Sequence, residues 1–315
     1  ISFAIVMQDF VHLPIHTQYS ILDGQASISK LVDKAIADGM RGMAVTDHGN
    51  MMGIKEFFNY CNKVNDKRQA AGEEPFKPIF GCEMYVVEDM HSRDPNMRRH
   101  HLIVLAKNQK GYKNLIKLVS RAWTEGFYHQ PRTDHSELER YHEGLIVCSA
   151  CIAGEVPRRI NNGDMKTAEE IALWYKNLFG DDYYLELQRH EVRNPNIRAN
   201  RETFPLQQEA NEGLLAIARK HNIKYMCSND VHFVDEDNAE AHDRLICLST
   251  SKDLDDPKRM LYTKQEWFKT RAEMSAVFHD HPEALATTCE ILDKVEVYSI
   301  DHGPIMPNLE IPEEF

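Results

Sequence analysis

The stretch FVHLPIHTQYSILDG, residues 10–24, carries the pattern on which the fold prediction is built. Its apolar run predicts a strand over 10–16 that ends in His16. Asp23 follows in the next loop, so that an imidazole and a carboxylate stand just after one strand. Both groups are common ligands of transition metals in proteins. The stretch therefore predicts one arm of a metal site.

Six further β-rich runs follow along the chain, and amphipathic helical patterns lie between most of them. The runs cover 43–48, 77–87, 101–106, 144–150, 183–190 and 225–233. Apolar residues recur at helical spacing over 27–39, 166–180 and 206–222. Strands that alternate with helices are typical of an α/β fold with a mostly parallel sheet, and seven such units favour a TIM-like barrel over an open sheet.

One junction between predicted strands differs from the others. Residues 88–100 are polar, contain a proline and have no helical periodicity. Only antiparallel neighbours can be joined without a crossover helix. We therefore expect the strands on either side of this junction to pair antiparallel.

Length and composition limit the class of protein. The chain has 315 residues and a formal net charge of -12, so it can build a large core while its surface as a whole repels nucleic acid. A phosphate-bearing substrate would need metal ions or local positive charge to attract it. The 7 cysteines show no framework spacing, which is typical of free thiols in a reducing, cytoplasmic compartment, and no apolar run is long enough to predict a membrane span.

The sequence changes character along its length, and these changes predict four parts. Residues 1–8 form an N-terminal extension and 9–250 form the barrel. Residues 251–298 are expected to form a covering helical segment. Residues 299–315 contain three prolines without helical periodicity, which predicts a linker towards a further domain.

Side chains that bind metals recur at the ends of the predicted strands. Besides His16 and Asp23, they are His48, Glu83, His101, Cys151, Asp230 and His232. A single histidine at a strand end is more often a hydrogen-bonded structural residue than a ligand, and Cys148 with Cys151 could form a redox pair. The recurrence of these side chains at one rim instead favours a site for two or three metal ions. In phosphatases and nucleases, paired metal ions activate a water molecule for phosphoester hydrolysis.

Six stretches carry a resemblance to a known family. They are FVHLPIHTQYSILDG (10–24), MAVTDHGNMMGIKEFF (43–58), KPIFGCEMYV (77–86), HHLIVLAKNQKGYKNLIKLVSRAWTEGFYHQPR (100–132), GLIVCSACIAGEVP (144–157) and CSNDVHF (227–233). At these residues the sequence resembles the polymerase and histidinol phosphatase (PHP) family, and within it the amino-terminal domain of bacterial DNA polymerase III alpha subunits. The fourth stretch is specific to the polymerase branch.

The resemblance implies a distorted seven-stranded (βα)7 TIM-like barrel that holds up to three divalent metal ions, such as Zn, Mn or Fe, with nine residues. Eight of the nine have counterparts here, which are His16, Asp23, His48, Glu83, His101, Cys151, Asp230 and His232. The ninth position is Pro14, which offers no ligand atom and no N–H. His12 is not expected to replace it, because it lies two residues earlier and about 6.6 to 6.8 Å lower on the same strand face.

The resemblance also implies how the ligands are shared. His16, Glu83 and Asp230 are expected to hold one ion, now one ligand short. Glu83 is expected to bridge to a second ion held with His48 and His101. The third ion is expected between Asp23, Cys151 and His232.

The same resemblance implies a part in DNA replication. The full-length protein would be a DNA-directed DNA polymerase with DNA, a proofreading subunit and a sliding clamp as partners, whereas this chain lacks an aspartate cluster for nucleotidyl transfer. The domain itself would be a metal-dependent phosphoesterase, a 3′–5′ proofreading nuclease, or a structural module that docks partners. The alternative is a free-standing PHP phosphatase acting on a small phosphate ester, and the polymerase-like stretch 111–128 and the proline-rich exit argue against it.

Overall fold

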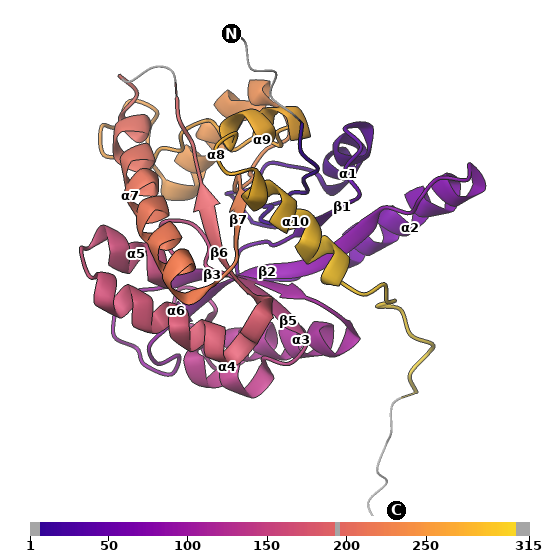
Figure 1. Cartoon of the computed structure of the whole chain (residues 1–315), viewed down its shortest axis with the longest axis horizontal. Coiled ribbons are helices and arrows are strands. Elements are labelled where there is room, and N and C mark those ends of the chain that lie inside the picture. Colours follow the sequence, from indigo (N-terminus) through magenta and orange to yellow (C-terminus); the bar gives the residue numbers. More distant parts are fainter. Residues whose placement is uncertain (1–6, 193–195, 307–315) are drawn as a thin grey trace, which may run out of the picture.

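A computed structural model describes residues 7–192 and 196–306 of the chain. Within them, one mixed sheet curls through the molecule with helices around its outside (Figure 1). Its strands, in spatial order, are β1 (Gly42–Val45), β2 (Lys77–Val87), β3 (His100–Ala106), β5 (Leu145–Cys148), β6 (Tyr183–Gln188) and β7 (Tyr225–Ser228), and β4 (Arg132–Asp134) also pairs with β2. The α/β prediction is therefore confirmed.

The helices follow the strands in the order expected for an α/β fold. They are α1 (Ile28–Ala37), α2 (Ile54–Ala70), α3 (Gln109–Thr124), α4 (His135–Tyr141), α5 (Glu155–Asn161), α6 (Met165–Phe179), α7 (Arg198–His221), α8 (Ala239–Thr250), α9 (Arg271–Val277) and α10 (Pro282–Lys294). Short 3₁₀ turns lie at Gly180–Asp182 and Glu236–Asn238. No helix in the described ranges is long and apolar enough to cross a membrane.

Strand β3 runs against the direction of its neighbours. It pairs antiparallel with both β2 and β5, whereas the pairs β1–β2, β2–β4, β5–β6 and β6–β7 are parallel. The antiparallel pairing predicted across residues 88–100 is thus confirmed. As a result, the beginning of β3 lies at the same rim as the ends of the parallel strands.

The prediction of a regular strand over 10–16 is wrong in detail. The segment is extended, but its backbone bonds are divided between two partners. The carbonyl oxygens of His12 and Ile15 accept from Ala44 and Thr46 at 3.0 and 2.9 Å. On the other side, His16 N donates to Val231 O at 2.7 Å and the Pro14 carbonyl accepts from Val231 N at 3.3 Å.

Proline explains part of this irregularity, because Pro14 has no N–H to donate to a ladder. The next amide, Ile15 N, donates to the Thr46 side chain at 2.9 Å. The segment therefore lies between the end of β1 and the residues that follow β7, and it joins the two edges of the curled sheet. Strand β4 was not predicted, since its three residues, RTD, contain no apolar run.

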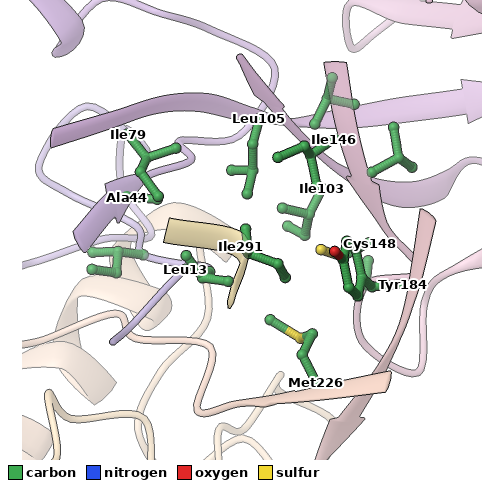
Figure 2. Close-up of a cluster of buried hydrophobic side chains, with 14 of the residues drawn as sticks. Leu13, Ala44, Ile79, Ile103, Leu105, Ile146, Cys148, Tyr184, Met226 and Ile291 are labelled. Carbon is green, nitrogen blue, oxygen red and sulfur yellow. The ribbon is translucent and has the colours of Figure 1, made fainter. Parts of the chain in front are cut away.

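The core fills the inside of the curled sheet. Figure 2 shows Leu13, Ile79 and Leu105 gathered around Ile291 of α10, and all four are buried. Further apolar residues of the predicted covering segment belong to the same core, namely Phe268, Met274, Phe278, Leu285 and Leu292. Helices α9 and α10 are therefore packed directly on the barrel, and the predicted linker 299–315 lies partly outside the described residues.

Candidate metal centre

Five predicted ligands form two compact groups at the rim. The nearest nitrogens of His16, His48 and His232 lie within 4.8 Å of one another, and the ligand atoms of His16, Glu83 and Asp230 do so as well. His16 ends the segment between β1 and β7, while Glu83 lies inside β2. The fold thus brings ligands from distant parts of the sequence together at one rim.

The first group contains buried polar atoms without hydrogen-bond partners. His16 Nε2 lies 3.2 Å from Asp230 Oδ1 and 3.7 Å from Glu83 Oε2. Both His16 Nε2 and Asp230 Oδ1 are buried and make no hydrogen bond within the described structure. An unsatisfied buried polar group costs about 1–3 kcal/mol. A cation between these atoms would satisfy both, so the group fits a metal ion.

A hydroxyl group sets the orientation of the His16 ring. Ser20 Oγ donates to Asp47 Oδ1 at 2.8 Å and accepts from His48 N at 3.1 Å. It lies 3.1 Å from His16 Nδ1, which must then be the nitrogen that carries the hydrogen. This tautomer leaves the Nε2 lone pair free, as a metal ligand requires. The sequence analysis did not identify Ser20, because a serine four residues after a histidine has no distinctive pattern.

His232 is held in the equivalent way. Its Nδ1 donates to the backbone oxygen of Asp230 at 2.7 Å. The free Nε2 then faces Asp23, whose Oδ2 is 3.7 Å away. Backbone carbonyl groups commonly fix metal-binding histidines in this manner.

Glu83 and Asp23 enclose His48 between two carboxylates. His48 Nδ1 lies 2.8 Å from Glu83 Oε1, and His48 Nε2 lies 2.6 Å from Asp23 Oδ2. The same Glu83 oxygen is 2.8 Å from His101 Nδ1. Glu83 thus contacts both histidines that were predicted to share its second ion.

Charge pairing determines the pKa values in this cluster. Burial alone would lower the pKa of His48, but the charge of Glu83 and hydrogen bonds to Asp23 and Glu83 hold it well above its usual value. Burial would likewise raise the pKa of Glu83, yet the charges of His101 and His48 keep it well below the ordinary range. Without an ion, His48 holds a proton that offsets the charge of its carboxylate partners, and metal binding would release this proton.

The structure divides the ligand group predicted for the third ion. Asp23 and His232 lie together, but Cys151 contacts His101 instead, with Sγ 3.6 Å from Nδ1. Burial is the main cause that raises the pKa of the Cys151 thiol well above its usual value, and the charges of Asp230 and Glu83 add to it. Cys151 therefore lies on the His101 side of the rim.

Pro14 and His12 lie away from these contacts. His12 Nε2 is bonded to the backbone oxygen of Lys269 at 2.8 Å, and its ring packs against Phe10 and Phe268. Burial lowers the pKa of His12 to about 3. His12 is therefore a core residue, and it belongs to neither of the two ligand groups found among the described residues.

A cavity of about 210 Å³ opens beside the cluster. It is lined by His48, His101 and Asp230 at the rim and by Tyr262 and Glu266 from the irregular segment after α8. Tyr262 donates to Asp23 Oδ1 at 2.9 Å. The sequence analysis missed Tyr262, because an isolated tyrosine in a segment without periodicity carries no signal.

Three of the loops that carry ligands contain strained backbone. Leu22, Ala150 and Asp230 have φ angles of 60°, 62° and 48°, in the left-handed region that non-glycine residues rarely adopt. Leu22 and Ala150 directly precede Asp23 and Cys151. Such strain persists only where surrounding structure enforces it, and it is concentrated at functional sites.

Comparison with known proteins supports the resemblance. The model of the PHP domain family matches residues 12–190. DNA polymerase III subunit alpha of Borreliella burgdorferi is 38% identical over 312 residues, which cover 97% of this chain and 25% of the relative. The same subunit of Treponema pallidum is 36% identical over 312 residues, again with 97% and 25% covered. The chain therefore spans about a quarter of the length of these curated relatives.

Similarities to solved structures are more distant. Histidinol phosphate phosphatase of Lactococcus lactis, solved with Zn, L-histidinol and phosphate, has a TM-score of 0.35 and 12% identity over 83% of this chain and 99% of that one. An amidohydrolase of Chromobacterium violaceum has a TM-score of 0.37 and 11% identity over 72% and 89%. Neither similarity is close enough to carry an argument about this chain.

The family assignment rests on the family model and on the rim together. The model matches more than half of the chain, and the histidine, glutamate and aspartate clusters at the rim are candidate metal sites typical of PHP domains. The chain belongs to the PHP domain family, and nearly its whole length matches a segment that makes up about a quarter of the length of bacterial DNA polymerase III alpha subunits.

Proposed function

We propose that this chain is the amino-terminal PHP domain of a DNA polymerase III alpha subunit and acts there as a metal-dependent phosphoesterase on DNA, removing nucleotides in the 3′–5′ direction. One observation carries the proposal. His16, Glu83 and Asp230 converge with buried atoms that lack hydrogen-bond partners, a donor set that suits a divalent ion.

The ligands proposed are the eight named from the sequence, for up to three ions of Zn, Mn or Fe. When bound, such ions lower the pKa of a coordinated water and polarise a phosphoryl oxygen. The chain's own groups orient the site, since Ser20 fixes the His16 tautomer and the Asp230 carbonyl fixes that of His232. The cavity of about 210 Å³ is smaller than pockets that enclose whole ligands, which favours a terminal phosphodiester as the enclosed group.

The longer protein would be a cytoplasmic DNA-directed DNA polymerase. Its partners would be DNA, a proofreading subunit and a sliding clamp. The relatives support this context because they match 97% of the chain, whereas a free-standing phosphatase would not need the polymerase-like stretch 111–128. Within the proposal, residues 9–250 form the barrel, 251–298 cover it and 299–315 lead to the rest of the protein.

Metal analysis combined with a nuclease assay tests this function. We expect the purified chain to bind fewer than three ions per molecule and to release nucleotides from single-stranded DNA, with the release abolished by a chelator. Glu83→Gln should lower both metal content and release, while Glu170→Gln, at an exposed position on α6, should change neither. A chain with no bound Zn, Mn or Fe and no nucleotide release would refute the enzymatic proposal.

A second candidate is a structural module that docks replication partners without catalysis. Pro14 favours it, since the first ion would lack one of its family ligands. The two candidates differ in one result. A catalytic domain loses nucleotide release in Glu83→Gln, whereas a structural module releases none in either form but still binds its partner subunit.

A further inference from the structure

Tyr262 reaches the rim from a part of the chain that supplies none of the eight predicted ligands. Its hydroxyl group donates to Asp23 Oδ1 at 2.9 Å and lies 3.3 Å from His232 Nε2. Its ring lies against that of His232, with centroids 4.8 Å apart. The phenol oxygen is therefore in contact with two predicted ligands at once.

The contact between the Tyr262 hydroxyl oxygen and His232 Nε2 is favourable only if a proton or a cation lies between these two atoms. His232 Nδ1 donates to the Asp230 carbonyl, so that a neutral ring presents a lone pair at Nε2. Tyr262 has one hydroxyl hydrogen, and Asp23 receives it. Two lone pairs then face each other across 3.3 Å. Either a second proton on His232 or a metal ion resolves this contact.

The spacing of the donor atoms suits a metal ion. Zinc bonds of about 2.0–2.1 Å in a tetrahedron place neighbouring ligand atoms roughly 3.3–3.4 Å apart. Here the Tyr262 hydroxyl oxygen lies 2.9 Å from Asp23 Oδ1 and 3.3 Å from His232 Nε2, and His232 Nε2 lies 3.7 Å from the other Asp23 oxygen, Oδ2. The three donors are therefore already at the spacing of a coordination sphere.

The position of Tyr262 is fixed by its neighbours in the chain. The next residue, Thr263, donates its backbone N–H to Glu266 Oε1 at 3.0 Å. The Glu266 backbone oxygen in turn accepts from His232 N at 2.8 Å. The turn that presents Tyr262 is thus bonded to the same segment that presents His232.

We propose that Tyr262 is an additional metal ligand, which binds through its phenolate oxygen an ion held together with Asp23 and His232. The proposal rests on the proposed function, in that the rim must bind metal. When the ion binds, the Tyr262 O–H bond breaks, its proton leaves to solvent, and an oxygen–metal bond replaces the hydrogen bond to Asp23. The covering segment then takes part in the metal centre directly.

Iron(III) added alone is the probe that separates a ligand from a residue that only positions Asp23. A phenolate bound to iron(III) gives a visible charge-transfer band, which histidine and carboxylate ligands do not give. A thiolate also gives one, so every chain in this comparison carries Cys151→Ser. We expect the iron-loaded chain to be coloured and Tyr262→Phe to be colourless at equal iron content. Tyr85→Phe is the matched control, because the Tyr85 ring lies near His48 and His101 but its hydroxyl bonds to no predicted ligand within the described residues, and it should keep the band.

Zinc affinity gives a second measurement. Tyr262→Phe should weaken the binding of one zinc ion at least about tenfold, although the loss of an outer hydrogen bond alone could reach this size. The charge-transfer band therefore decides whether Tyr262 is a metal ligand. Bound iron without a band, or an equal band in Tyr262→Phe, would overturn this proposal and leave the proposed function intact. A wild-type chain that binds no iron or zinc would overturn both.

Discussion

Strands β2 and β3 each serve two different regions of the barrel. β2 carries Ile79 at the apolar interior and Glu83 four residues later at the rim, and β3 carries His101 at the rim and Leu105 four residues later in the interior. Residues four apart on a strand lie on the same face, so both regions line the inside of the sheet. The same strands thus build a packed core and a charged cluster.

The two regions contribute to stability with opposite signs. Full burial of a leucine or isoleucine stabilises by about 1.5–3 kcal/mol. The rim instead buries His16 Nε2 and Asp230 Oδ1 without partners, at about 1–3 kcal/mol for each. The apolar region therefore stabilises the fold, whereas these two rim atoms cost free energy until a cation is bound between them.

The largest expected effect separates core from rim on one strand. Leu105→Ala should lower the free energy of unfolding by about 2–5 kcal/mol, because it removes methyl groups from a close-packed core. Metal content of the folded protein should stay the same. Urea unfolding in the presence of a chelator and metal analysis measure the two quantities.

His101→Ala is the matched variant on the rim. It should lower metal content while changing the metal-free unfolding free energy less than Leu105→Ala does. The reverse ranking of the two variants would contradict the division between core and rim.

The second prediction compares two buried histidines through pH. The folded-state pKa of His12 is about 3, below the usual 6.5, since burial disfavours its charge. The unfolded chain then binds the extra proton, and stability is lost as pH falls from 6.5 towards 3. The folded-state pKa of His232 is about 9, because hydrogen bonding and charge from Asp23 outweigh burial. Its stabilisation is complete below 6.5 and is lost as pH rises through 9.

Unfolding of the metal-free chain across this pH range measures both slopes. Each pKa unit corresponds to about 1.4 kcal/mol, so the rise of the His232 pKa from 6.5 to about 9 corresponds to a loss of at most about 3.5 kcal/mol. His232→Asn should flatten the alkaline side and His12→Gln the acidic side. If either variant changed the opposite side, the assignment of the two pKa values would be wrong.

Restoring the missing ligand is the third prediction. Pro14→His should raise metal affinity by at least about tenfold, or about 1.4 kcal/mol, because it adds an imidazole to the ion shared by His16, Glu83 and Asp230. Pro14→Ala restores the backbone N–H without a ligand atom and is the control. Equal metal content in the two variants would show that Pro14 does not stand at a ligand position.

The smallest expected effect concerns strain in the rim loops. Leu22 has a φ of 60° and is 41% exposed, so that Leu22→Gly removes left-handed strain and little buried surface. We expect the unfolding free energy to rise by up to about 1 kcal/mol, while Leu22→Ala, which keeps the strain, gives no rise. Thermal unfolding of the two variants measures the difference, and a destabilised Leu22→Gly would argue against strain at this loop.

Much of the fold and the candidate ligand set could be predicted, since both depend on short-range patterns. Apolar runs predicted seven strands, of which six are strands in the structure, and the polar junction 88–100 predicted the reversal of β3. The ligands followed from residue types at strand ends and from the family resemblance. The strand predicted over 10–16 failed because its backbone bonds depend on tertiary contacts and are divided between two edges. The contact of Cys151 with His101 also depends on the fold and has no sequence pattern. Tyr262 lies 30 residues from His232 in a segment without a pattern.

The segment around Pro14 joins β1 to the residues after β7, and this junction affects which part of the sheet opens first. Four backbone hydrogen bonds, divided between Ala44, Thr46 and Val231, take the place of a continuous ladder there. This junction should open before the other strand pairs, and amide hydrogen exchange should be fastest at these residues within the sheet. An ion held between His16 and Asp230 would span the same junction, so that metal release and local opening of the barrel become one coupled equilibrium.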